Sequence, residues 1–126
     1  MSVTYSWHDE NQTILHVEFV DKWAWDDMYQ IRDSVLDDYT GNDTVYIIAD
    51  FRETNHIPGN AMAHGTKALE KMHPNQGLQI FIGAPTALQK MFEIAKTFMP
   101  KVIAGANFTF ADSFDDALGI IEDEKV

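Results

Sequence analysis

The chain has 126 residues, which is enough for one well-packed hydrophobic core and too few for two ordinary domains. Hydrophobic residues make up 45% of the sequence and no low-complexity tract interrupts it, so we expect one ordered domain over residues 1–126. The absence of cysteine excludes disulfide bonds, a thiolate nucleophile and a cysteine-ligated zinc site.

The formal net charge of −11 argues against nucleic acid and anionic membranes as partners, because both are bound mainly through Lys and Arg. The charge is unevenly distributed, however, since residues 67–101 contain five lysines and only two acids, Glu70 and Glu93. The lysines are Lys67, Lys71, Lys90, Lys96 and Lys101. They are either the solvated faces of helices or a mildly basic patch for an acidic protein partner.

The first residues, MSVTYSWHDE, show neither the basic nor the apolar region of a signal peptide. Apolar runs are only a few residues long, whereas a membrane-spanning helix needs about 20 apolar residues. We therefore expect a cytoplasmic protein.

Residues 4–8 and 13–20 alternate between apolar and polar side chains and are rich in β-branched and aromatic types, which predicts an antiparallel hairpin. In the second strand, Leu15, Val17 and Phe19 share one face, which should be the buried one. His16 lies on the opposite face, and we interpret it as a half-buried strand residue and not as a ligand.

A first helix should follow residues 21–25, because Met28, Ile31, Val35 and Tyr39 fall on one helical stripe. Gly41 is expected to end this helix as its C-cap.

Trp23 and Trp25 precede this helix and allow two interpretations. They could form an exposed binding surface, or they could cover the core. Because aromatic side chains contribute so much burial energy, the core interpretation is favoured.

Residues 45–72 are the stretch around which the rest of the chain is organised. The run VYIIAD predicts a buried strand that ends on Asp50, followed by a loop with Pro58 and Gly59 and a helix that begins near Asn60. In open α/β sheets, the loops that follow the strands carry the site. We therefore expect the site to lie in this loop or beside it.

The remaining chain repeats the alternation of strand and helix. Residues 78–83 predict a buried strand, and Pro85 begins a helix over residues 86–98. A strand at residues 108–110 leads to a cap at Asp112 and Ser113 and to a last helix. The 86–98 helix is expected to bury Leu88, Met91, Phe92, Ala95, Phe98 and Met99, and the last helix to bury Phe114, Ala117, Leu118 and Ile121.

The predicted order is ββαβαβαβα, an α/β fold with a mixed, mainly parallel five-stranded sheet and about four helices. The chain has a pattern that comprises residues 45–72 and the stretches GLQIFIGAPTALQKMFEIAKTFM and FTFADSFDDAL. This pattern resembles the STAS domain. This is the fold of bacterial anti-sigma-factor antagonists of the SpoIIAA type. The resemblance runs from the hairpin to Ile121.

Members of that family have a strand that ends in an Asp, a short loop, and a helix that opens on an Asp-Ser-Ser/Thr-Gly motif with a phosphorylated serine. Asp50 matches the strand-end Asp. The motif itself is replaced by Pro58, Gly59, Asn60 and Ala61. The resemblance thus implies the fold and a partner-binding loop at these positions.

The phosphorylation switch of the family has no acceptor here. No hydroxyl side chain lies between Asn55 and Gly65, and phosphorylation needs one at the start of the helix. Thr54 and Thr66 flank the loop but lie several residues out of place. We expect a domain of this type without covalent control.

His56, His64 and His73 accompany Asp50 and Glu53 in this region, and histidine with carboxylate is a common zinc ligand set. The spacing contains no pair of the HExxH kind. The chain also lacks a glycine-rich phosphate loop and a GxSxG turn. We therefore expect no metal, no cofactor and no enzymatic activity.

Two functional hypotheses remain. The first is a non-enzymatic regulatory domain that binds an anti-sigma-factor-like protein or a second copy of itself. Binding of a second copy would give a homodimer. Its binding residues would be Asp50, Thr54, Asn55, His56, Pro58, Gly59, Asn60, Ala61 and His64. The second is a carrier or sensor of a small molecule or lipid, with the same fold and a cavity lined by Met62, Met91 and Phe92.

Overall fold

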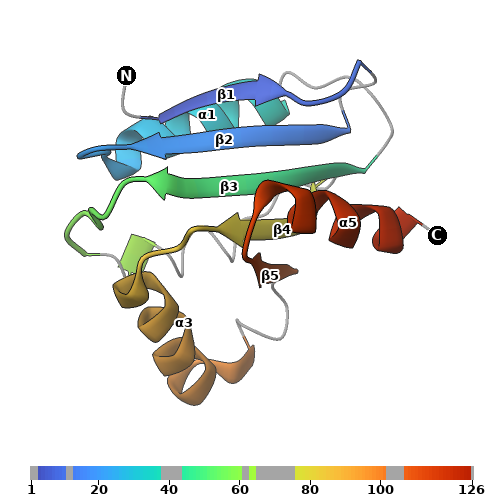
Figure 1. The fold of residues 1–126 in the computed structure, drawn as a ribbon. Helices are drawn as coiled ribbons and strands as arrows, with labels where there is room; N and C mark the ends of the chain where they lie inside the picture. The colour runs from blue at the N-terminus through green and yellow to red at the C-terminus, as the bar shows by residue number, and fades with distance from the viewer. Residues whose placement is uncertain are drawn as a thin grey trace.

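The computed structural model describes residues 3–10, 13–37, 44–60, 63–64, 76–101 and 107–125, and in these a five-stranded sheet carries three helices (Figure 1). The elements are β1 (Val3–Trp7), β2 (Ile14–Val20), α1 (Trp25–Asp37), β3 (Val45–Glu53), β4 (Gln76–Ile82), α3 (Thr86–Phe98), β5 (Phe108–Ala111) and α5 (Phe114–Lys125). None of these helices, of which the longest have 13 residues, could cross a membrane.

The strands lie in the order of the chain, β1-β2-β3-β4-β5. β1 pairs with β2 antiparallel, and the pairs β2–β3, β3–β4 and β4–β5 are parallel. The hairpin turn is closed by Asp9, whose carboxylate accepts the backbone N–H groups of Thr13 and Ile14 at 2.8 and 3.0 Å. The predicted mixed, mainly parallel sheet is therefore confirmed.

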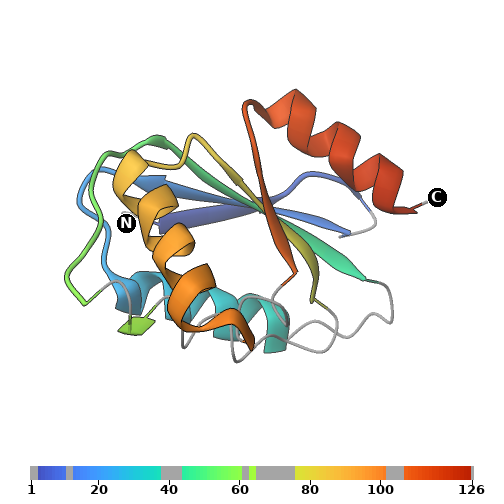
Figure 2. The ribbon, with the colours of Figure 1, turned by 90° about the horizontal axis from the view of Figure 1, so that it is seen from below.

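The helices cover both faces of the sheet, with α1 and α3 on one face and α5 on the other (Figure 2). The alternation of side chains along each strand divides the core accordingly, because neighbouring residues point to opposite faces. Leu15, Val17 and Phe19 of β2 pack toward α1 and α3, as predicted. Ile48 and Ile80 pack toward α5 and are completely buried.

The central strand is longer than predicted, because β3 continues past Asp50 to Glu53. Two contacts extend it. Val20 of β2 pairs with Glu53, and the Asp50 carboxylate accepts the backbone N–H of Arg52 at 3.0 Å. The strand-end Asp is consequently an interior residue of β3.

The predicted bounds of α3 are confirmed, but only three of the six residues predicted to be buried are buried, and Met91 and Met99 are half-buried. Leu88, Phe92 and Ala95 face the sheet and are buried, whereas Phe98 is 76% exposed. Phe98 follows Ile94 by one turn, and both side chains point away from the buried stripe.

The predicted helix from Asn60 to residue 72 lies largely outside the described residues. Residues 63–64 are helical, and the His64 N–H donates to the Asn60 carbonyl at 3.1 Å. Tyr39, Gly41 and Met62 also lie outside the described residues.

Candidate functional site

The Asp50 side chain lies at the centre of a polar cluster on the middle strand. It is only 4% exposed. Arg52 binds both of its oxygens, with Nε donating to Oδ1 at 2.9 Å and Nη2 donating to Oδ2 at 2.7 Å. His16 Nε2 lies 2.9 Å from Oδ2 across the β2–β3 pair. A buried carboxylate must be satisfied in this way to be tolerated.

Burial raises the pKa of Asp50, because it penalises the charged form. The hydrogen bonds from the Arg52 side chain and backbone and from His16 outweigh this effect and lower the pKa to about 2. Asp50 is therefore a fixed negative charge at neutral pH. This favours a structural role over proton transfer, for which a pKa near the working pH is preferred.

The cluster is closed by residues from other elements. The Phe114 ring at the start of α5 packs on the His16 ring with a centroid distance of 4.8 Å. Gly83, which follows β4, has a φ of +63°, and a Cβ there would lie 2.6 Å from the Arg52 Cγ. Only glycine allows both this backbone conformation and the close approach of Arg52.

Two tryptophans hold the loop after β3. Trp23 precedes α1, and Trp25 is its first residue. Trp23 Nε1 donates to the His56 carbonyl at 2.8 Å, and Trp25 Nε1 donates to the Gly59 carbonyl at 3.0 Å. We call Trp23 and Trp25 the indole clamp. Thr54 adds a third attachment, because its hydroxyl donates to the Asp21 carbonyl and accepts the His56 N–H at 3.0 Å.

The start of the next helix is attached to the same clamp. His64 stacks on Trp25 with a centroid distance of 5.2 Å, and its Nδ1 lies 3.0 Å from the Tyr29 hydroxyl. Asn60, between the loop and this helical turn, has a φ of +60°. Asparagine tolerates this left-handed conformation better than most residues.

The predicted binding residues therefore divide by exposure. Asp50 and Thr54 are buried and act by holding their neighbours in place. Asn55, Gly59 and Asn60 are exposed, and three other predicted binding residues are half-buried. These are His56, Pro58 and His64. Ala61 lies outside the described residues. We call residues 55–60 the clamped loop, since both ends of its backbone are fixed.

Some residues that the structure brings to this region were not singled out from the sequence. His16 was interpreted only as a strand residue, and Arg52 received no role. Trp23 and Trp25 are buried, as the core interpretation predicted, but their N–H groups have a second role in the loop. No local pattern in the sequence indicates the contact between His16 and Asp50, because it depends on the parallel register of β2 and β3, in which His16 lies opposite Ile48 and Glu18 opposite Asp50.

A small cavity of about 60 Å³ lies between α1 and the sheet. Its lining consists mainly of apolar residues from β2, β3 and α1, with three polar residues, Arg32, Gln76 and Gln79. Arg32 Nη1 and Gln76 Oε1 are buried without a hydrogen-bond partner within the described part of the chain. The apolar lining residues are Leu15, Val17, Phe19, Met28, Ile31, Ile47 and Ala49.

Of the residues predicted to line a ligand cavity, the described ones do not line this cavity, and Phe92 instead lines a separate hollow of about 350 Å³ between α3 and β5. Phe92 packs on Phe81 and Phe108 at centroid distances of 5.3 and 4.7 Å, and Met91 packs against the edge of the same core. Met62 lies outside the described residues. Within the described residues no three His, Cys, Asp or Glu side chains come close enough to share a metal ion.

Solved structures with a similar fold include an uncharacterized protein from the DUF3478 family with a SpoIIAA-like fold, from Shewanella loihica PV-4, determined at 2.25 Å. The two share 18% sequence identity with a TM-score of 0.59 over 93% of this chain and 90% of that one. No protein-family model matches the chain, and no curated protein does. The similarity shows that the chain has a SpoIIAA-like fold.

Proposed function

We propose that the protein is a non-enzymatic regulatory domain that binds a protein partner through the clamped loop. The observation that carries this proposal is the attachment of an exposed loop to buried indoles by hydrogen bonds of 2.8 and 3.0 Å. Fixing a loop before binding lowers the entropy lost on association. A loop with exposed Asn55, Gly59 and Asn60 offers backbone and amide groups to a partner.

The location of the loop supports the same proposal. It follows β3 at the carboxyl end of the parallel strands, which is where α/β sheets commonly place their binding sites. On the resemblance to SpoIIAA-type domains, Pro58, Gly59 and Asn60 at the end of the loop match positions of the phosphorylated motif. Since residues 55–60 contain no hydroxyl side chain, the surface would bind its partner without a covalent switch.

Gly59 is the best position at which to test this function. It is exposed, and a Cβ there would meet no atom of the described residues within 4 Å, so a substitution at this position begins in open space. Asn60 is less suitable because its left-handed backbone would be strained by tryptophan. We expect Gly59→Trp to lose the protein partners that the wild type captures from its native cell extract, because the indole blocks the loop surface.

The matched control is Gly59→Ala, which adds only a methyl group at the same place. It should capture the same partners as the wild type, and both variants should keep the wild-type circular dichroism spectrum and melting temperature. If folded Gly59→Trp captures the same partners in the same amounts as Gly59→Ala, the clamped loop is not the binding surface.

The cavity beneath α1 favours a second candidate, a small-ligand carrier or sensor. The donor at Arg32 Nη1 and the acceptor at Gln76 Oε1, which have no partner among the described residues, would both be satisfied by a carboxylic acid or primary amide with an apolar body. At about 60 Å³ the cavity holds only a small group, so a lipid would require the surrounding elements to move apart.

A thermal-shift series with aliphatic carboxylates and carboxamides of increasing chain length tests this candidate. A ligand present at about 100 times its Kd stabilises the folded state by about 2.7 kcal/mol, which raises the melting temperature by several degrees. Arg32→Met, which keeps the apolar stem and removes the donors, should abolish the shift. The candidate is excluded if no compound stabilises the wild type, or if Arg32→Met responds equally.

A further inference from the structure

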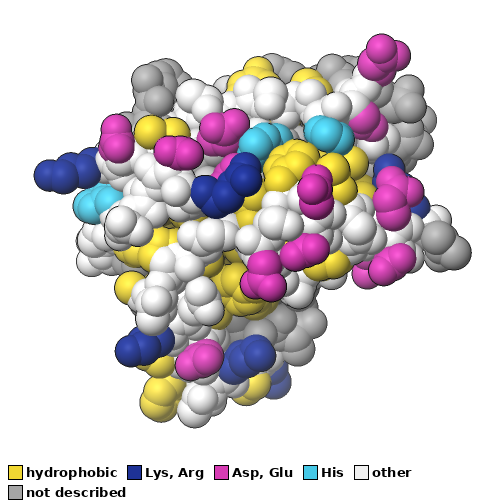
Figure 3. All heavy atoms as spheres, in the orientation of Figure 1, with side chains coloured by type: hydrophobic (Ala, Val, Ile, Leu, Met, Phe, Trp, Pro, Cys, Tyr) yellow, Lys and Arg dark blue, Asp and Glu magenta, His cyan; other side chains and the backbone are white. Residues whose placement is uncertain are grey.

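The outer face of α3 combines exposed apolar side chains with positive charge. Ile94 is 49% exposed and Phe98 is 76% exposed, and they lie one turn apart on the same face. Lys90 lies one turn before Ile94, and Lys101 follows the helix. Figure 3 shows yellow apolar and dark blue basic side chains together at the bottom of the molecule, where α3 lies. Such a face is unexpected on a chain with a net charge of −11 unless something covers it.

The outer face of α5 has the opposite character. Gly119 is exposed at its centre, and a Cβ there would meet no atom of the described part of the chain within 4 Å. An open hollow of about 550 Å³ surrounds it. The hollow has an apolar side formed by Phe110, Ala111 and Ile120 and an acidic rim formed by Asp112, Asp115, Asp116 and Asp123.

The two faces are complementary in charge, and each also presents apolar side chains. An exposed aromatic ring flanked by lysines on α3 matches a hollow with apolar residues and four aspartates at α5. We propose that Phe98 of one copy of the chain docks into the α5 hollow of a second copy. Lys90 and Lys101 then pair with the acidic rim, and burial of the Phe98 ring contributes most of the binding energy.

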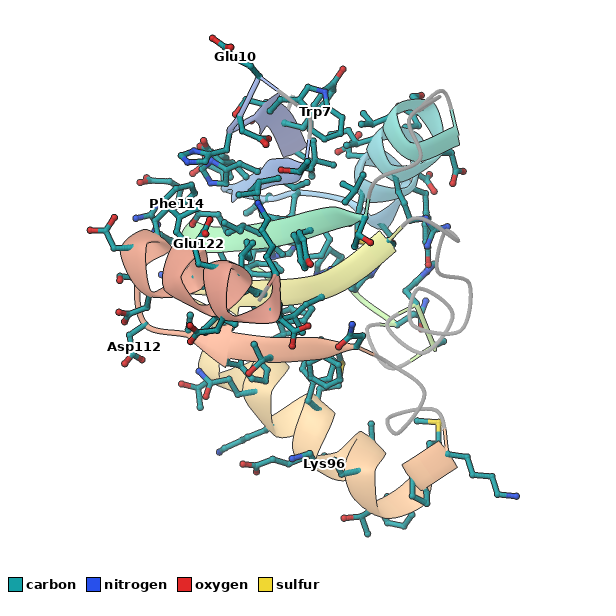
Figure 4. All side chains as sticks on the ribbon, turned by 90° about the vertical axis from the view of Figure 1, so that its right-hand side faces the viewer. Trp7, Glu10, Lys96, Asp112, Phe114 and Glu122 are labelled. Atoms are coloured by element: carbon teal, nitrogen blue, oxygen red, sulfur yellow. The ribbon has the colours of Figure 1, made fainter. Side chains whose placement is uncertain are left out.

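The arrangement of the elements determines what kind of assembly this contact makes. α3 and α5 lie on either side of β5, with Lys96 on the α3 side and Asp112 and Glu122 on the α5 side (Figure 4). Each copy therefore presents one of each surface. The contact joins two different surfaces, so it builds a ring if the rotation closes and an open chain if it does not.

Sedimentation equilibrium of the whole chain from about 1 µM to about 1 mM, at low and high salt, tests the proposal. We expect the average mass of the wild type to rise with concentration and to fall with added salt. Phe98→Ser and Gly119→Arg should each weaken association about tenfold or more, because one removes the aromatic anchor and the other fills the hollow with a positive charge.

Mixing the two variants gives the sharpest result. Phe98→Ser keeps a working hollow and Gly119→Arg keeps a working α3 face, so the mixture should form one-to-one dimers and nothing larger. The controls are Gly119→Ala, which leaves the hollow open, and Tyr5→Ser, which removes from β1 an aromatic ring that is 49% exposed. A wild type that stays monomeric at low salt would overturn the proposal. So would equal losses from Tyr5→Ser and Phe98→Ser, or variants that do not pair when mixed.

Discussion

Replacing Asp50 with Asn is expected to lower the free energy of unfolding by about 2–3 kcal/mol at neutral pH. The carboxylate receives two hydrogen bonds from the Arg52 side chain and one from its backbone, and it contacts His16. Asparagine keeps the shape of the side chain but loses the charge that Arg52 binds. Urea unfolding followed by tryptophan fluorescence measures the change. Glu10→Gln, an exposed change of the same kind, should have almost no effect.

The stability difference between the wild type and Asp50→Asn should depend on pH. Because the folded-state pKa of Asp50 is lowered from 3.8 to about 2, its ionised form stabilises the protein above pH 3.8. That contribution is lost as the pH falls from about 4 toward 2. The stability difference between the wild type and Asp50→Asn should therefore be constant near pH 5–7 and shrink below about pH 4. A difference that does not change with pH would show that the charge of Asp50 is unimportant.

The second large effect is expected from removing both donors of the indole clamp. The double variant Trp23→Phe, Trp25→Phe keeps two aromatic rings but loses the N–H groups that bind the His56 and Gly59 carbonyls. Each lost hydrogen bond costs about 0.5–1.5 kcal/mol, and the smaller rings leave space in the core. We expect a total loss of about 2–4 kcal/mol in the free energy of unfolding.

The loop itself provides the specific measurement. Backbone amide exchange of residues 55–60 should become faster in the double variant than global unfolding alone explains. Phe19→Leu is the matched control, because Phe19 packs on Trp23 in the same core but donates no hydrogen bond to the loop. It should reduce overall stability without a selective effect on the loop. Equal exchange in the two variants would mean that the indoles only fill the core.

Local patterns in the sequence were sufficient for most of the fold. The bounds of α3 follow from Pro85 and the spacing of its apolar residues, and the hairpin follows from alternation along β1 and β2. The same patterns identified the loop after β3 as the candidate site. These features depend on residues close together in the chain, where periodicity and capping act.

The features that were missed depend on contacts between distant residues. His16 meets Asp50 only because β2 and β3 pair in one particular register, and 34 positions separate them in the chain. The indoles reach the loop across a similar separation of 33 and 34 positions. The apolar character of Phe98 predicts burial, but its position on the helix, one turn after Ile94, directs its side chain away from the sheet.

The most direct measurement of the central claim is the affinity of the purified protein for the partner that the wild type captures. Calorimetric titration would compare the wild type, Gly59→Ala and Gly59→Trp. The clamped-loop account predicts that Gly59→Ala binds within about threefold of the wild type and that Gly59→Trp binds at least about a hundredfold more weakly. Equal Kd values for folded Gly59→Trp and Gly59→Ala would contradict it.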